Sequence, residues 1–332
     1  MMKAVFMTAV GGPEVLQLQE TQEPTPGSKE LLVRLKAAGV NPLDWKMRKK
    51  GTRYPDRLPA ILGCDGAGIV ERIGQDVEHF KIGDEVYFCH GGIGDHPGNY
   101  AELAIVNEDY AARKPTSLNF LDAGAAPLVL ITAWESLHDR AKIKKGQKIL
   151  VHAGAGGVGH VAIQLAKAAG CQVCTTIGSE EKANFVYSVG ADKAILYKKD
   201  DFVQAALDWT DGNGVDVALD TVGDETFAKT LSAVRYYGDL VTILSPPVDM
   251  NWGVARVRNV RVSFELMLTP MTEGLETGKQ HHAWILEQCG SLFDDGRLKI
   301  KVDRTFPLHE AAEAHRYLES GSGMGKVVLA ID

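Results

Sequence analysis

Residues 147–159 read Gln-Lys-Ile-Leu-Val-His-Ala-Gly-Ala-Gly-Gly-Val-Gly, and they determine how the second half of the chain is interpreted. An apolar run, Ile149 to Val151, predicts a strand, and a helical pattern of apolar residues begins at Val161. Between them, glycines stand at the spacing G-x-G-x-x-G, which permits a tight turn and lets backbone N–H groups approach a pyrophosphate. This order predicts a dinucleotide site built from Gly154, Ala155, Gly156, Gly157, Val158 and Gly159.

The next predicted strand, residues 172–177, indicates which dinucleotide is bound. An NAD site places a carboxylate at the end of this strand, about 20 residues beyond the glycines. Here the strand ends in Gly178 and Ser179, with no acid. Ser179 can donate to a 2′-phosphate, and Lys182 and Tyr197 can line the same pocket. The pattern therefore favours NADPH.

Two acidic residues argue against a phosphate at this place. Glu180 and Glu181 follow Ser179 directly and would repel a phosphate if they pointed inward. On a helix over residues 179–189 they can face solvent while Lys182 does not. Solvation is also the ordinary state of a helical lysine, so the role of Lys182 is a hypothesis.

Composition excludes several classes of function. The chain has 332 residues, 45% hydrophobic and 24% charged, which is typical of an ordinary folded protein large enough for two domains. A net charge of −7 with scattered basic residues gives no nucleic-acid surface. No apolar run is long enough to insert in a membrane, and the N-terminus lacks an export signature. Five sparse cysteines favour a reducing compartment, so we expect the cytoplasm.

The pattern of apolar runs changes near residue 123. Before it, short runs broken by Gly, Pro and Asp predict a β-rich region. After it, strands alternate with helices, which predicts an α/β fold with a doubly wound parallel sheet of six strands. The predicted strands are 148–152, 172–177, 193–197, 215–220, 239–244 and 260–265. Trp252, Phe264 and Trp284 are expected in the core.

A glycine motif near residue 155 resembles the medium-chain dehydrogenase/reductase superfamily, and the match covers nearly the whole chain. Within it, Val-Asn-Pro-Leu-Asp at 40–44 is similar to the zinc-free quinone oxidoreductase branch, which includes zeta-crystallin. The resemblance implies a GroES-like β-rich catalytic domain, residues 1–122 and 267–332, around a Rossmann NADP-binding domain, residues 123–266. It also implies a homodimer joined through the edge strand near Val260–Leu266.

The same resemblance suggests site residues. Asn41, Lys46 and Thr132 fall near the nicotinamide, Thr132 as a cofactor contact and the other two as catalytic candidates. Lys46 stands where many relatives have Tyr, and it is equally one charge in a basic run. Leu244 and Ser245, ending the fifth strand, and Lys326 near the C-terminus are further cofactor candidates.

No metal site is expected. Catalytic zinc needs three protein ligands. In the alcohol dehydrogenase pattern they would fall at Asn41, Cys64 and near Pro127, and only Cys64 can ligate. His90 and His96 are interpreted as solvated residues of a glycine-rich loop.

Without a Lewis acid, conjugated acceptors are the easier substrates. We therefore expect NADPH-dependent hydride transfer to a small-molecule quinone or α,β-unsaturated carbonyl compound. One alternative is a reductase of enoyl thioesters or aldehydes. Another, from a different class, is a dinucleotide-binding structural or sensing protein with little turnover.

Overall fold

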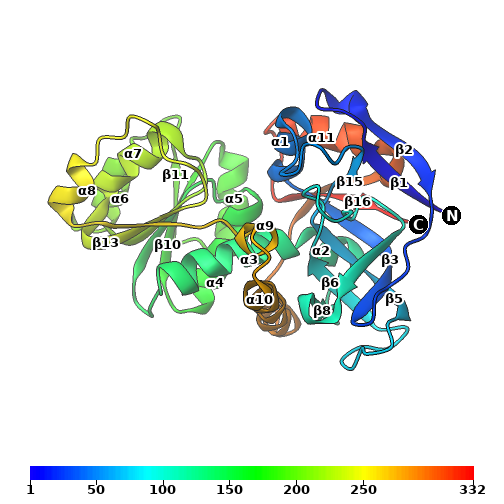
Figure 1. Ribbon diagram of the computed structural model, residues 1–332. Helices are drawn as coiled ribbons and strands as arrows, with labels where there is room; N and C mark the ends of the chain where they lie inside the picture. Colours follow the sequence, from blue (N-terminus) through cyan, green and yellow to red (C-terminus); the bar gives the residue numbers. More distant parts are fainter. The chain divides into compact units, whose positions relative to one another are not determined.

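The computed structural model describes every residue from Met1 to Asp332 (Figure 1). The chain divides into two compact units, which we call unit 1 and unit 2. Unit 1 comprises residues 1–128, 268–296 and 300–332, and unit 2 comprises residues 129–267 and 297–299. No helix is both long and apolar enough to cross a membrane.

Unit 2 is built on a six-stranded parallel sheet in the order β11-β10-β9-β12-β13-β14. Numbered along the unit this order is 3-2-1-4-5-6, the doubly wound Rossmann arrangement. The predicted fold class is confirmed. The strands are β9 (Lys148–Val151), β10 (Gln172–Ile177), β11 (Lys193–Leu196), β12 (Val215–Asp220), β13 (Val234–Thr242) and β14 (Arg261–Phe264).

Helices flank this sheet and connect its strands (Figure 1). A buried core of β-sheet residues such as Leu150 and Leu240 packs against Phe227 and Leu231 of one of these helices. The helices are α3 (Pro127–Trp134), α4 (Gly157–Ala168), α5 (Glu180–Ser188), α6 (Phe202–Trp209), α7 (Asp224–Ala233) and α8 (Gly253–Arg258). The chain passes from unit 1 to unit 2 within α3.

Unit 1 is β-rich, as expected for a GroES-like domain. A seven-stranded sheet has the order β15-β16-β3-β5-β6-β8, with β7 also paired to β3, and a three-stranded sheet has the order β2-β1-β4. The strands are β1 (Met2–Met7), β2 (Leu16–Thr21), β3 (Glu30–Val40), β4 (Ala60–Ile61), β5 (Asp65–Ile73), β6 (Glu85–Cys89), β7 (Leu103–Asn107), β8 (Ala111–Arg113), β15 (Val302–Pro307) and β16 (Lys326–Ala330).

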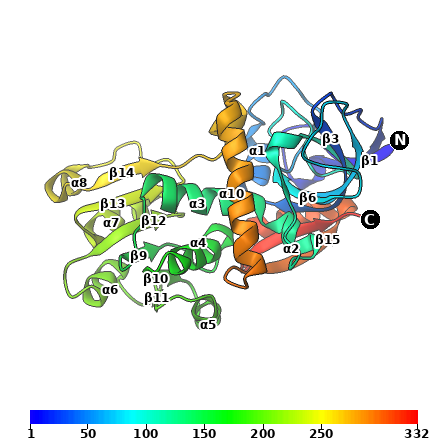
Figure 2. The same cartoon turned by 90° about the horizontal axis from the view of Figure 1, so that it is seen from below.

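Five helices complete unit 1, and the longest is the 19-residue α10, drawn in orange in Figure 2. They are α1 (Pro42–Lys50), α2 (Phe120–Ala125), α9 (Thr269–Thr272), α10 (Glu276–Asp294) and α11 (Ala311–Glu319). Helix α1 begins at a capping box, because the Asn41 and Asp44 side chains accept each other's backbone N–H groups.

The prediction that three aromatic side chains lie in the core is wrong. Trp252, Phe264 and Trp284 expose 42%, 56% and 44% of their surface. Aromatic residues on helix and strand faces carry no sequence signal that separates a core contact from an exposed face. In contrast, all five cysteines are buried free thiols, as expected for small hydrophobic side chains.

Candidate active site

The glycine motif of unit 2 lies where β9 turns into α4. A Cβ on Gly154 would lie 2.0 Å from Oγ1 of Thr175 on β10, and one on Gly159 would lie 2.3 Å from the carbonyl oxygen of Ala153. Both positions therefore require glycine. Helix α4 begins at Gly157, so the N–H groups of its first turn have no partner within the helix. With the helix dipole, they form a site for an anion such as a pyrophosphate.

A buried histidine, which the sequence did not indicate, supports this turn. His152 Nδ1 lies 3.1 Å from Oγ1 of Thr176, and its Nε2 lies 2.8 Å from Oγ1 of Thr230 on α7. Thr176 Oγ1 also accepts the Ala153 backbone N–H at 3.0 Å. Burial lowers the pKa of His152 to about 4, so the ring is neutral at pH 7. It fixes the end of β9 to β10 and α7 without adding charge.

The end of β10 has the polar but uncharged character expected from the sequence. Ser179 caps α5, and its Oγ accepts the backbone N–H of Lys182 at 3.3 Å. Lys182 is half-buried, whereas Glu180 and Glu181 are exposed. Tyr197 lies over Gly178, because a Cβ there would be 3.2 Å from the tyrosine hydroxyl.

The ends of β12 and β13 are tied together by Asp220. Its Oδ1 accepts the Gly223 N–H at 2.9 Å, and its Oδ2 accepts the Thr242 hydroxyl at 2.9 Å. Thr242 in turn accepts the Leu244 N–H at 3.1 Å. Leu244 and the exposed Ser245 therefore lie at the same edge of the parallel sheet as the glycine motif and Ser179. Thr132 lies on α3, where it is 5% exposed.

In unit 1, Asn41 and Lys326 meet in the interior. The Lys326 ammonium donates to Asn41 Oδ1 and lies 3.5 Å from Asp65 Oδ2, and Asn41 Nδ2 donates to the same oxygen at 2.8 Å. Asp65 Oδ1 accepts the Leu128 N–H at 2.7 Å. Asn41 and Asp65 are fully buried and Lys326 is 3% exposed, so Lys326 is engaged inside unit 1. The contact between Asp65 and Lys326 has no signal in the sequence.

Lys46, the other catalytic candidate, lies on the exposed face of α1. Its ammonium stands 5.9 Å from the centre of the Trp45 ring. The structure thus joins Asn41 with Lys326 and leaves Lys46 outside that cluster.

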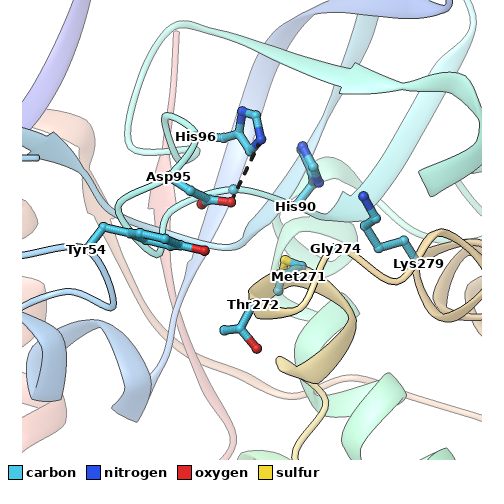
Figure 3. Close-up of a pocket in the computed structure, with 9 residues that line it drawn as sticks. Tyr54, His90, Asp95, His96, Met271, Thr272, Gly274 and Lys279 are labelled. Atoms are coloured by element: carbon cyan, nitrogen blue, oxygen red, sulfur yellow. Dashed lines mark ion pairs between the residues drawn. The ribbon is translucent and has the colours of Figure 1, made fainter.

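A cavity of about 300 Å³ opens in unit 1 (Figure 3). Tyr54, His90, Asp95, His96 and Lys279 surround it. Nε2 of His96 is 3.8 Å from Oδ2 of Asp95, and the rings of His90 and His96 lie 5.7 Å apart. His96 is exposed, as predicted, whereas His90 is half-buried, and desolvation lowers the pKa of His90 to about 4. A neutral imidazole offers one donor and one acceptor to a ligand.

Comparison with known proteins agrees with this architecture. Residues 27–116 match the alcohol dehydrogenase GroES-like domain, and residues 189–329 match a family described as zinc-binding dehydrogenase. The chain is 34% identical to a quinone oxidoreductase of Pseudomonas aeruginosa over 99% of each chain. It is 31% identical to a 2-haloacrylate reductase of Burkholderia sp over 99% of each. The structure of Escherichia coli quinone oxidoreductase complexed with NADPH matches with a TM-score of 0.88 at 31% identity, covering 99% of both chains.

The chain belongs to the quinone oxidoreductase branch of the medium-chain dehydrogenase/reductase superfamily. One matching family is described as zinc-binding, so the zinc positions of the superfamily were compared with the residues present. Asn41 is committed to Asp65 and Lys326, and the nearby ammonium would repel a cation. The hydrogen bond with Cys89 lowers the pKa of the Cys64 thiol, but burial raises it above its usual value. This quinone oxidoreductase therefore does not have residues that fit a catalytic zinc.

Proposed function

We propose that this chain is an NADPH-dependent oxidoreductase that transfers a hydride to a quinone or an α,β-unsaturated carbonyl compound. The observation that carries the proposal is the glycine turn at the centre of a 3-2-1-4-5-6 sheet whose second strand ends without an acid. The likeness to quinone oxidoreductases and to a 2-haloacrylate reductase supports the choice of acceptor.

The residues of unit 2 would bind and orient the cofactor, which supplies the hydride. The first turn of α4 would hold the pyrophosphate through backbone N–H groups. Ser179, Lys182 and Tyr197 would surround the 2′-phosphate, since Ser179 and Lys182 begin α5 just beyond β10 and the Tyr197 hydroxyl lies beside Gly178. Leu244 and Ser245 would lie on the nicotinamide side, because ligands bind at the carboxyl ends of parallel strands.

The residues of unit 1 would bind the acceptor. We assign the cavity beside Tyr54 and His90 to the substrate, because a phenol and a neutral imidazole can donate hydrogen bonds to a carbonyl oxygen. Such donors stabilise the negative charge that develops on oxygen after hydride addition. Asn41 is fully buried and does not line this cavity, so it would act on the reaction by holding Asp65 and Lys326 in place. Lys46 remains a weaker candidate because it is exposed.

A change of cofactor preference tests the proposal. Ser179→Asp keeps a capping side chain on α5 but places a carboxylate beside the expected 2′-phosphate. Repulsion of about 1–4 kcal/mol per pair of charges predicts a fall of about 5- to 1000-fold in kcat/KM for NADPH, with NADH activity kept or raised. Ser179→Asn, also a good cap but neutral, is the control. Equal kinetics of the two variants with NADPH would refute this placement of the phosphate.

The assay is NADPH oxidation followed by absorbance, with a quinone, a short enone and a 2-haloacrylate as acceptors. Turnover of at least one acceptor is expected. Binding of NADPH without oxidation by any of them would favour the alternative of a binding protein with little turnover.

We also propose that the chain forms a homodimer through β14. This strand pairs only with β13 and forms one edge of the sheet of unit 2. Phe264 and Leu266 expose 56% and 49% of their surface there. An unpaired edge with apolar side chains is a template for pairing with a second copy. Phe264→Glu is expected to shift the sedimenting mass from dimer to monomer, and a wild type that sediments as a monomer would overturn the proposal.

We propose the cytoplasm as the site of action. All five cysteines are free and buried, with no disulfide among them. Free thiols are typical of proteins that work in a reducing compartment.

A further inference from the structure

A chain of three polar side chains crosses the interior of unit 1. His315 on α11, Tyr100 between β6 and β7, and Asp44 on α1 are each fully buried. The Tyr100 hydroxyl lies 3.2 Å from Nε2 of His315 and 3.0 Å from Oδ2 of Asp44. The Tyr100 ring is held in place by Gly63, where a Cβ would lie 2.4 Å from two ring carbons.

The hydrogen-bond pattern allows one orderly arrangement of protons. Asp44 Oδ2 accepts both the Tyr100 hydroxyl and, at 2.7 Å, the Asn41 backbone N–H. The single hydroxyl proton of Tyr100 is then used, so its oxygen accepts a proton donated by Nε2 of His315. The three residues thus form a directed chain from the imidazole to the carboxyl group.

Each end of this chain is a buried polar atom without a partner in the protein. Oδ1 of Asp44 and Nδ1 of His315 are buried and have no hydrogen-bond partner in the protein. A buried polar atom without a partner costs about 1–3 kcal/mol, and such atoms are normally satisfied by water or a ligand. Water bound at the two unpartnered atoms would extend the chain in both directions, which is what a proton path requires.

We propose that His315, Tyr100 and Asp44 form a proton relay that supplies the proton consumed when the acceptor is reduced. This inference rests on the proposed function, because NADPH, one proton and a quinone give NADP⁺ and a hydroquinone. It assigns to Asp44 a role beyond its capping of α1.

The steps balance in atoms and charge. Asp44 gives up the proton on Oδ1 toward the reduced acceptor. The Tyr100 O–H bond breaks as its proton moves to Oδ2, and the Nε2 proton of His315 moves to the tyrosine oxygen. Nδ1 of His315 takes a proton from water. One proton leaves at one end, one enters at the other, and no residue is oxidised or reduced.

The surroundings favour the uncharged forms of Asp44 and His315. The pKa of Asp44 is raised to about 7, mainly by burial. The Asp65 charge also raises this pKa, whereas Tyr100 and Lys326 lower it. Burial and the Arg48 guanidinium lower the pKa of His315 to about 3. The Asp44 carboxyl group can therefore hold a proton near pH 7. The His315 imidazole is neutral at this pH and is positively charged only while a proton passes through it. The charged and titratable groups that face the relay are Asp65, Lys326, Cys64, Arg48 and Glu319.

The test uses two variants that interrupt the relay and one matched control. Tyr100→Phe removes the middle oxygen. His315→Gln keeps an amide N–H that can donate to Tyr100 but has no second nitrogen to accept a proton. The control is Tyr87→Phe, because Tyr87 is equally buried and loses one hydroxyl contact, to the Leu286 carbonyl, away from the relay.

With NADPH and a quinone, we expect kcat to fall about 10- to 100-fold in both relay variants and to stay within about twofold of wild type in Tyr87→Phe. The KM for NADPH should not change. In the relay variants kcat should rise with the concentration of a small buffer acid such as imidazolium, because external acid must supply the proton. If folding fails in Tyr100→Phe, the His315→Gln variant carries the same test.

A second readout does not depend on turnover. Infrared spectra of the wild type with NADPH bound should show a protonated carboxyl band that is lost as pH rises through about 7 and is absent in Asp44→Asn. Absence of this band from the wild type at about pH 6 would overturn the relay. So would relay variants that match Tyr87→Phe in kcat, or that lose activity without any response to buffer acid. A wild type that binds NADPH but does not oxidise it with any of the acceptors overturns the proposed function and the relay with it.

Discussion

Asp44 makes the stability of unit 1 depend on pH in an unusual direction. Burial raises the pKa of its carboxyl group from 3.8 to about 7. Between these values the native protein holds a proton that the unfolded chain releases, so this residue makes stability fall as pH rises from about 4 to about 7. At about 1.4 kcal/mol per pH unit, the difference amounts to about 4 kcal/mol.

Asp44→Asn should remove this dependence. The amide oxygen can still accept the N–H of Asn41 and the hydroxyl of Tyr100, so the contacts survive while the charge does not. We expect the free energy of unfolding of the variant, relative to wild type, to rise steadily between about pH 4 and pH 7. Above about pH 7 the difference should be constant, and its total change should approach about 4 kcal/mol.

The measurement is urea unfolding of both proteins across this pH range. Burial lowers the pKa of His90 and His315, so these residues make stability rise with pH below about 6.5, in the opposite direction. Their contribution cancels in the difference between variant and wild type. Asp56→Asn, at an exposed site, is the control and should leave the curve unchanged. A variant curve parallel to that of wild type at all pH values would refute the reasoning.

Two further substitutions test the packing on which the site depends. Gly154→Ala would place a Cβ 2.0 Å from Oγ1 of Thr175, so calorimetry should show a loss of about 1–3 kcal/mol, part of which Thr175→Ala restores. No loss, or no restoration, would contradict the close approach of β9 and β10. Lys326→Met leaves Asp65 buried without its cation and should cost about 3–5 kcal/mol in urea unfolding, with most of it recovered when Asp65→Asn is added. A small loss without recovery, accompanied by weaker NADPH binding, would instead favour Lys326 as a cofactor residue.

The sequence predicted unit 2 well because its signals are local. Each parallel strand is a short apolar run between a glycine or polar turn and a helix, so the six predicted strands match the observed ones to within a few residues, apart from β13, which begins at Val234. Unit 1 was harder, since strands such as β4, with two residues, owe their existence to partners far away in the chain. Helix α1 was missed although its capping residues, Asn41 and Asp44, carry a known start signal.

The same difference between local and distant contacts decides which site residues could be predicted. The glycine turn and Ser179 were predicted because spacing and strand order carry their meaning. Tyr100 and His315 were not, because a lone tyrosine and a histidine 215 residues further along the chain have no pattern in common. They meet only in the folded unit 1, where α11 and the segment between β6 and β7 lie side by side.

The ion pairs around Asp44 in the interior of unit 1 explain why its carboxyl group tends to be protonated. Two cations, Lys326 and Arg48, face two carboxylates, Asp65 and Glu319, as ion pairs. The exposed Lys49 also pairs with Glu319, whereas no cation is paired with Asp44, so an ionised Asp44 would be a further negative charge in a fully buried place. The pKa of Asp44 rises to about 7 because burial disfavours the charged carboxylate, and protonation removes that charge. The Lys326 ammonium lowers the pKa of Asp44, so its removal in Lys326→Met should raise the pKa of Asp44 above the wild-type value. The infrared band of the protonated Asp44 carboxyl group, followed against pH, measures this change.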